Sequence, residues 1–186
     1  RNPVGNGSAP VIRRAVLDQI AYRPRHEPLR DWYFDETFRQ SEDIECWLRI
    51  ALTTDWAFEG VPGLLTRYRI NAGGLSAATD RQLAAWERMV EKLTPLNPAF
   101  FTVNTPVARA YQLRYLCRRA ISDLDAPRAQ ALSRAWTAQS RVPLVEEPVK
   151  SAVTLAASAA LATFGSARLH RAMTLVRRLR SARAVQ

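Results

Sequence analysis

The sequence predicts an α/β fold over residues 1–78, followed by an all-α tail over residues 79–186. Short apolar runs in the first part, at residues 10–12, 56–61 and 64–70, are bounded by glycine, proline and asparagine, which is typical of short β-strands. From residue 79 onward, apolar residues instead recur at the three- and four-residue spacing of amphipathic helices. This change of pattern sets the expected domain boundary at residue 78.

Length and composition exclude several classes of protein. The chain has 186 residues, of which 47% are hydrophobic and 24% charged, so it is neither disordered nor collagen-like. A chain of this length buries a core without disulfide or metal staples. Cys46 and Cys117 are too few for a disulfide framework or a four-thiolate zinc site. No apolar run reaches the roughly 20 residues of a membrane-spanning helix.

The clearest helix of the first part is expected to begin after Ser41. Ser41 is a typical N-cap residue, and Glu42 and Asp43 fall in the first turn, where the helix dipole favours negative charge. A weaker helical pattern covers residues 15–20. The apolar face of the stronger helix recurs at i, i+3, i+4 and i+7, and consists of Ile44, Trp47, Leu48 and Ala51.

The tail is expected to contain several helices. Residues 79–82 have the spacing of a capping box and begin a helix that extends to residue 93. A proline-rich link at 95–106 leads to a helical face at 113–124. Asp125 is expected to cap the next helix, and Gly165 marks the break between the last two. The last three helices are expected at residues 127–140, 149–164 and 166–182.

Five short motifs of the first part resemble, in their order, the C-terminal half of the catalytic domain of a family 2 glycosyltransferase. In this chain they are the small-residue loop at residues 2–8, Arg13-Arg14, residues 34–38 (FDETF), residues 42–49 (EDIECWLR) and residues 67–71 (RYRIN). Each motif alone is weak, and their common order makes the resemblance more specific. It covers residues 1–78.

The resemblance implies a Rossmann-like GT-A fold and an inverting glycosyltransferase. The implied donor is a nucleotide-sugar, and the implied acceptor is a glycan or lipid-linked molecule in bacterial cell-surface polysaccharide synthesis, on the cytoplasmic side. Asp43 matches the family's catalytic base, which takes a proton from the acceptor hydroxyl. Glu42, its neighbour, would help to orient the site. The residues that would contact substrate are Gly5, Asn6, Gly7, Ser8, Trp32 and Asn71.

The chain departs from the family pattern in its metal site. The family's nucleotide-binding half and its D-x-D motif would precede residue 1, so we expect a fragment that is inactive alone. The divalent cation of the full enzyme, Mg²⁺ or Mn²⁺, would have most of its ligands outside this chain. The string at residues 123–125 (DLD) follows a helix and the base, and is interpreted as a cap. Many relatives have histidine at the position of Asn71, and Asn is a poor metal ligand. His26 and His170 have no partner at ligand spacing, so no metal site is expected here.

The charge is concentrated at the C-terminal end of the chain. The net charge is +10, and no acidic residue follows Glu147. Such an end suits anionic lipid or nucleic acid, and it equally fits a solvated helical face. The alternative function is therefore a basic, helical nucleic-acid-binding protein. No helix-turn-helix, zinc-finger or RNP signature supports that alternative, so we expect no nucleic acid partner.

Residues 151–164 contain no charge and are too short to span a bilayer. Two interpretations of this segment stay open. It packs against the helices at 106–140, or it lies in a membrane interface with the arginines that follow near anionic lipid.

Overall fold

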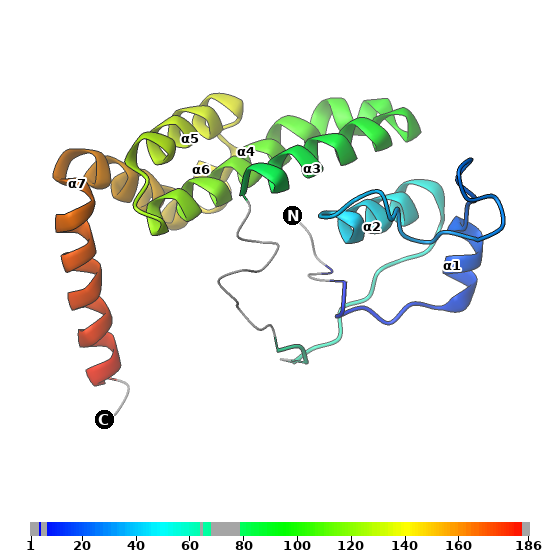
Figure 1. The fold of residues 1–186 in the computed structure, drawn as a ribbon, viewed down its shortest axis with the longest axis horizontal. Coiled ribbons are helices and arrows are strands. Elements are labelled where there is room, and N and C mark those ends of the chain that lie inside the picture. Colours follow the sequence, from blue (N-terminus) through cyan, green and yellow to red (C-terminus); the bar gives the residue numbers. More distant parts are fainter. Residues whose placement is uncertain (1–3, 5–6, 64, 68–78, 184–186) are drawn as a thin grey trace. The chain divides into compact units, whose positions relative to one another are not determined.

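The computed structural model describes residues 4, 7–63, 65–67 and 79–183, and for residues 79, 80 and 166–183 it describes the backbone only. These residues form seven α-helices and one short 3₁₀ helix (Figure 1). They divide into two compact units, residues 1–102 and 103–186. The sequence boundary was expected at residue 78, whereas the structure groups the next helix with the first unit.

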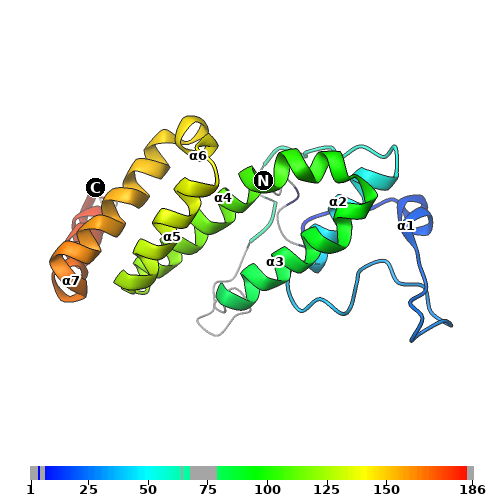
Figure 2. The same cartoon turned by 90° about the horizontal axis from the view of Figure 1, so that it is seen from above.

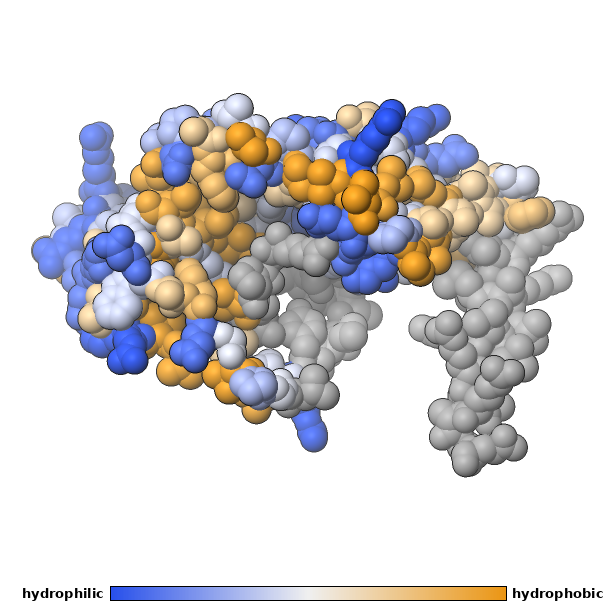
Figure 3. Space-filling view, turned by 180° about the vertical axis from the view of Figure 1, so that it is seen from behind, coloured by the Kyte–Doolittle hydropathy of each residue, from blue (hydrophilic) through white to orange (hydrophobic). Residues whose placement is uncertain are grey.

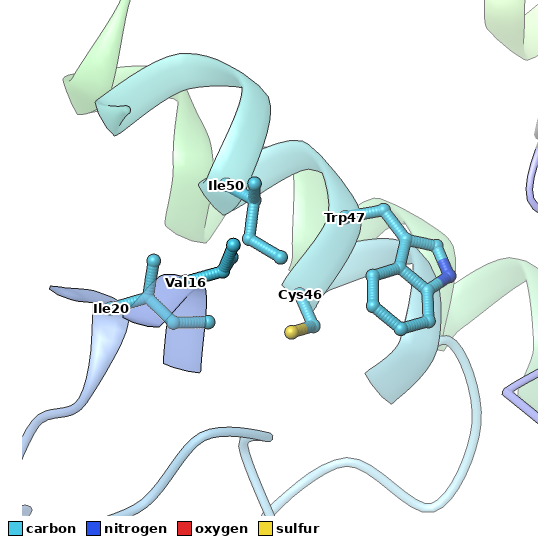
Figure 4. Close-up of a cluster of buried hydrophobic side chains, with 5 residues drawn as sticks. All are labelled: Val16, Ile20, Cys46, Trp47 and Ile50. Carbon is cyan, nitrogen blue, oxygen red and sulfur yellow. The ribbon is translucent and has the colours of Figure 1, made fainter. Parts of the chain in front are cut away.

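The first unit contains α1 (Arg14–Ile20), α2 (Glu42–Thr53), α3 (Thr79–Leu93) and the 3₁₀ helix η2 (Thr94–Leu96). Helices α1 and α2 pack together, and α2 also contacts α3. Figure 4 shows side chains of α1 pointing toward those of α2. This core consists of Val16, Ile20, Cys46, Trp47 and Ile50.

The predicted α/β fold, and with it the GT-A sheet, is wrong, because the described residues form helices and no β-strand. A strand is stable when its backbone pairs with a neighbour and one of its faces is buried. The described parts of the three predicted strands have neither, and only an isolated antiparallel bridge joins Tyr22 and Trp32. Their exposed apolar side chains are Val11, Trp56, Phe58, Val61 and Leu65.

The second unit contains α5 (Ala126–Gln139), α6 (Val142–Glu146), α7 (Pro148–Arg183) and most of α4 (Pro98–Ser122). Figure 2 shows α5 alongside the first part of α7, in agreement with their contacts. Gly165 interrupts α7 at φ 76°, as the sequence predicts. Asp125 caps α5 by accepting a hydrogen bond from the backbone N–H of Arg128. The all-α tail is therefore confirmed.

The proline-rich link differs from the prediction. Helix α4 already begins at Pro98, because Asn97 accepts a hydrogen bond from the backbone N–H of Phe100 and proline fits the first helical position. Pro106 lies inside the helix. The core of the second unit includes Leu116, Cys117, Ala129, Trp136 and Leu161, which are all buried. None of the helices in the described ranges is both long and apolar enough to cross a membrane.

Candidate functional site

The predicted site residues fall into two groups. Gly5, Asn6 and Asn71 lie outside the described residues. The others are described, and they occupy the entry to α2 and the loops before it. They are Gly7, Ser8, Trp32, Glu42 and Asp43.

Asp43 lies in the first turn of α2 and is half-buried. Its Oδ1 accepts a hydrogen bond from the backbone N–H of Ile44 at 2.7 Å. Ser41 occupies the N-cap position, but in the left-handed conformation (φ 67°) and without a side-chain cap. The backbone N–H of Glu45 donates to the carbonyl oxygen of Ser41, so among the side chains of this turn Asp43 supplies the hydrogen bond to the helix start. Three acidic residues in the first turn complement the helix dipole.

The N-terminal loop reaches α2 at Asp43. A Cβ atom added at Gly7 would lie 3.6 Å from the Cβ of Asp43, which is ordinary van der Waals contact. Two of the five ordered motifs, far apart in sequence, are therefore neighbours at this carboxylate. Gly7 and Ser8 are exposed, so solvent reaches this part of the loop.

A cavity of about 790 Å³, lined by both apolar and polar residues, lies along the same face of α2. Asp43, Trp47 and Ile50 share this face because they are spaced i, i+4 and i+7. Trp47 and Ile50 line the cavity, together with Val4 and Ile12. The extended segment from Trp56 to Val61 forms its outer wall. The cavity volume is within the range of small-molecule sites.

A network of charged side chains, the ionic cluster, lies on another face of α2. Its members are Asp35, Glu45, Arg49 and Lys92. The Nζ of Lys92, from α3, donates to Asp35 and to Glu45, both at 2.7 Å. Arg49 donates to Glu45 at 3.0 Å and to the backbone carbonyl of Ile20 at 2.7 Å. The cluster thus ties α2 to α1, to the loop before α2 and to α3.

Burial and pairing oppose each other in this cluster. Burial pushes the pKa of Asp35 upward, but hydrogen bonds from Lys92 and Thr37 outweigh it and the pKa is lowered. Burial similarly opposes the charged form of Lys92, and bonds to Asp35 and Glu45 leave its pKa raised. Both groups are therefore held in their charged forms.

Trp32 is buried within the loop before α2. Its indole N–H donates to Glu27 at 2.9 Å, and its ring packs edge-on against His26 and Tyr22. Hydrogen bonds from Arg30 and Trp32 lower the pKa of Glu27 to about 2. In this arrangement the ring stabilises the loop and does not line an open surface.

Sequence reasoning missed Asp35, Glu45 and Lys92 as interacting residues. The i, i+4 spacing of Glu45 and Arg49 was a detectable signal for one pair. Lys92 carried no such signal, because it lies 57 residues from Asp35 in the chain.

Comparisons with known proteins add no relative. No protein-family model matches the chain, and searches of curated proteins and of solved structures found no match.

Proposed function

We propose that the chain belongs to an inverting glycosyltransferase in which Asp43 is the general base. The observation that carries this proposal is the proximity of Gly7 to Asp43, since a Cβ atom added at Gly7 would lie 3.6 Å from the Cβ of Asp43 and the small-residue loop thus stands beside a first-turn acid. The order of the five sequence motifs supports the same assignment. The proposal concerns this site and not the fold, since the described residues form helices without a sheet.

The proposed reaction begins when the Asp43 carboxylate accepts the proton of an acceptor hydroxyl. The acceptor oxygen then forms a bond to the anomeric carbon of the donor sugar, and the bond from that carbon to the diphosphate oxygen breaks. The nucleoside diphosphate leaves with the bonding electrons. Attack from the face opposite the leaving group inverts the configuration. Glu42 adds negative charge beside the base, and Gly7 leaves space for a sugar ring near it.

The cavity suggests which acceptor would suit the site. Its apolar lining residues, which include Trp47 and Ile50, favour an apolar group, although Arg13 and Glu59 also line the cavity. Asp43 does not line the cavity, but it lies one helical turn from Trp47 on the same face of α2. An acceptor with a lipid chain would place that chain in the cavity and its hydroxyl at the carboxylate. A reaction that uses nucleotide-sugars belongs in the cytoplasm, where these donors are available.

The divalent cation that the sequence resemblance implies does not fit the described residues. Among them, no three His, Cys, Asp or Glu side chains converge on one point. The proton transfer to Asp43 does not involve the cation.

The test is a transfer assay on the full-length protein that carries this chain. UDP-glucose, UDP-galactose, UDP-N-acetylglucosamine and GDP-mannose serve as donors, octyl glucoside as acceptor, and released nucleoside diphosphate as the readout. Asp43→Asn keeps the shape but cannot accept the proton, so we expect kcat to fall by about 10²–10⁴-fold. Asp123→Asn, an exposed aspartate between α4 and α5, is the matched control and should change kcat less than threefold.

Two results would overturn the proposal. If the parent and a folded Asp43→Asn variant release nucleoside diphosphate at the same acceptor-dependent rate, Asp43 is not the base. Absence of acceptor-dependent release from all four donors contradicts the assignment as a glycosyltransferase.

A further inference from the structure

Helix α7 has an unusual distribution of side chains over residues 148–164. Its inward face carries hydroxyl groups, since Ser151, Thr154 and Ser158 are all buried. Ser151 accepts a hydrogen bond from Arg114 and donates to the carbonyl oxygen of Pro143, both at 2.6 Å. Thr154 donates to the carbonyl oxygen of Lys150 at 2.7 Å. These hydroxyl groups are therefore turned toward the protein, together with the fully buried Leu161.

The outward face of the same helix is apolar. Val149, Val153 and Phe164 are 74%, 61% and 57% exposed. Alanines that are exposed or half-buried fill most positions between them, and at 100° per residue the set covers an arc of about 140°, which also contains one exposed polar residue, Thr163. The alanines are Ala152, Ala156, Ala159 and Ala160. We define these seven residues as the outer face of α7. Figure 3 shows pale orange and orange residues at the right of the molecule, at its border with the grey atoms.

The sequence that follows this face has one sign of charge, whereas Glu146 and Glu147 stand directly before α7. Residues 151–167 carry no charge, and six arginines without any acidic residue follow at residues 168–183. An apolar helical face beside a strongly basic segment is complementary to one kind of surface, an apolar layer covered by negative charge. A bilayer of anionic lipids has this composition.

We propose that the outer face of α7 binds an anionic lipid bilayer. Residues 148–164 lie flat in the interface, with the valines and Phe164 between the lipid headgroups. The six arginines of residues 168–183 supply positive charge that attracts anionic lipid. Self-association through the same face would bring two basic segments of equal charge together, which Coulomb repulsion opposes. This binding is independent of the proposed glycosyl transfer.

The test is co-sedimentation of the full chain with vesicles of phosphatidylcholine alone and with vesicles that contain 30% phosphatidylglycerol. We expect binding to the anionic vesicles, weaker binding as salt rises, and little binding to neutral vesicles. Arg177→Gln, Arg178→Gln and Arg180→Gln together should weaken binding by about 100-fold, because each arginine near an anionic surface contributes a factor of about five.

A second pair of variants separates the outer face from charge alone. Val149→Asp with Val153→Asp should weaken binding at least tenfold, because two exposed valines no longer enter the interface. Ala131→Asp with Ala135→Asp, at exposed positions of α5 with the same i, i+4 spacing, adds the same charge and is the matched control. Circular dichroism confirms that each variant is folded. Val149→Leu with Val153→Leu should bind at least as strongly as the parent.

Three results would overturn the proposal. Equal binding by the Val→Asp pair and its α5 control shows that the outer face does not contact lipid. Equal binding to neutral and anionic vesicles removes the role of the arginines. Absence of vesicle binding, with dimers in analytical ultracentrifugation that Val149→Asp and Val153→Asp abolish, assigns the face to a second copy of the chain.

Discussion

Lys92→Met tests whether the ionic cluster stabilises the first unit. Lys92 is one of two lysines in the chain, and its ammonium group joins Asp35 to Glu45. Methionine keeps an unbranched side chain of similar length but removes the charge and both hydrogen bonds. The carboxylate of Glu45, which is 0% exposed, is then paired with Arg49 but has lost its second cation.

The structure sets the expected magnitude. Removing one partner of a buried ion pair typically costs about 3–5 kcal/mol. Two features reduce this figure: the Lys92 side chain is 33% exposed, and Arg49 remains bonded to Glu45. Loss of the contacts of the ammonium with the rings of Tyr22 and Phe38 adds about 0.5 kcal/mol each. We expect the free energy of unfolding to fall by about 2–3 kcal/mol.

Urea unfolding followed by tryptophan fluorescence measures this change. Four of the five tryptophans lie in the first unit, so the signal reports mainly on it. Arg23→Met is the matched control in the same unit, because the Arg23 side chain is 59% exposed and its bond to Asp31 is a surface ion pair worth less than about 1 kcal/mol. If the free energy of unfolding falls equally in the two variants, the ionic cluster does not stabilise the first unit. A double-mutant cycle with Glu45→Gln should give a coupling of about 1–3 kcal/mol.

The effect of Lys92→Met should also depend on pH. The pKa of Asp35 is lowered in the folded chain, so its contribution is present above the unfolded value near pH 4 and is lost as pH falls through the folded pKa. The pKa of Lys92 is raised, so its contribution is present below about pH 10.4 and is lost as pH rises through the folded pKa. The difference between parent and variant is therefore largest between about pH 5 and 9. A difference that is constant from pH 2 to 9 would contradict this assignment.

Three further predictions concern other parts of the structure. Arg114→Met should destabilise the second unit by about 3 kcal/mol in thermal melts, because it leaves buried polar groups unpaired, while Arg118→Met at an exposed position of α4 should cost less than 0.5 kcal/mol. Burial raises the pKa of Cys46 to about 11 and also that of Cys117, so a thiol reagent at pH 8 should modify neither until urea unfolds the chain. The free energy of unfolding of Gly7→Ala in urea should be within about 0.5 kcal/mol of that of the parent, because the added Cβ would lie at ordinary contact distance from Asp43.

The helices were predictable because their signals are local. The start of α2, the cap at Asp125 and the break at Gly165 depend on residues within one or two turns of each other, and the structure contains each of them. The predicted apolar face of α2 is correct only at Trp47, because Ala51 is exposed and the buried side chains are Glu45, Cys46, Trp47 and Ile50. The start of α4 was missed because Pro98 and Pro106 were treated as link residues. A proline after a capping asparagine is a start signal, and the helix accommodates the second proline.

The prediction of strands is wrong because an apolar run in the sequence does not show whether a partner strand is present. Val11, Val61 and Leu65 have the residue types of a buried strand, yet the described chain supplies no neighbour to pair with them and they stay exposed. The same limit applies to the site. The proximity of Gly7 to Asp43 and the bonds of Lys92 involve distant positions, so propensity and spacing alone carried no information about them.

Two acidic residues of α2, Asp43 and Glu45, have different roles in the candidate site. Glu45 is fully buried and held by Lys92 and Arg49, whereas Asp43, two residues earlier, stays half-buried beside the exposed loop at Gly7. A carboxylate neutralised by two cations cannot act as a free base, and a half-buried one can. The ionic cluster, which includes Glu45, holds α2 against α1 and α3. The first turn of α2, which carries Asp43, is therefore held in place. The position of Asp43 therefore depends on the ionic cluster, and Lys92→Met should disturb the site as well as the fold.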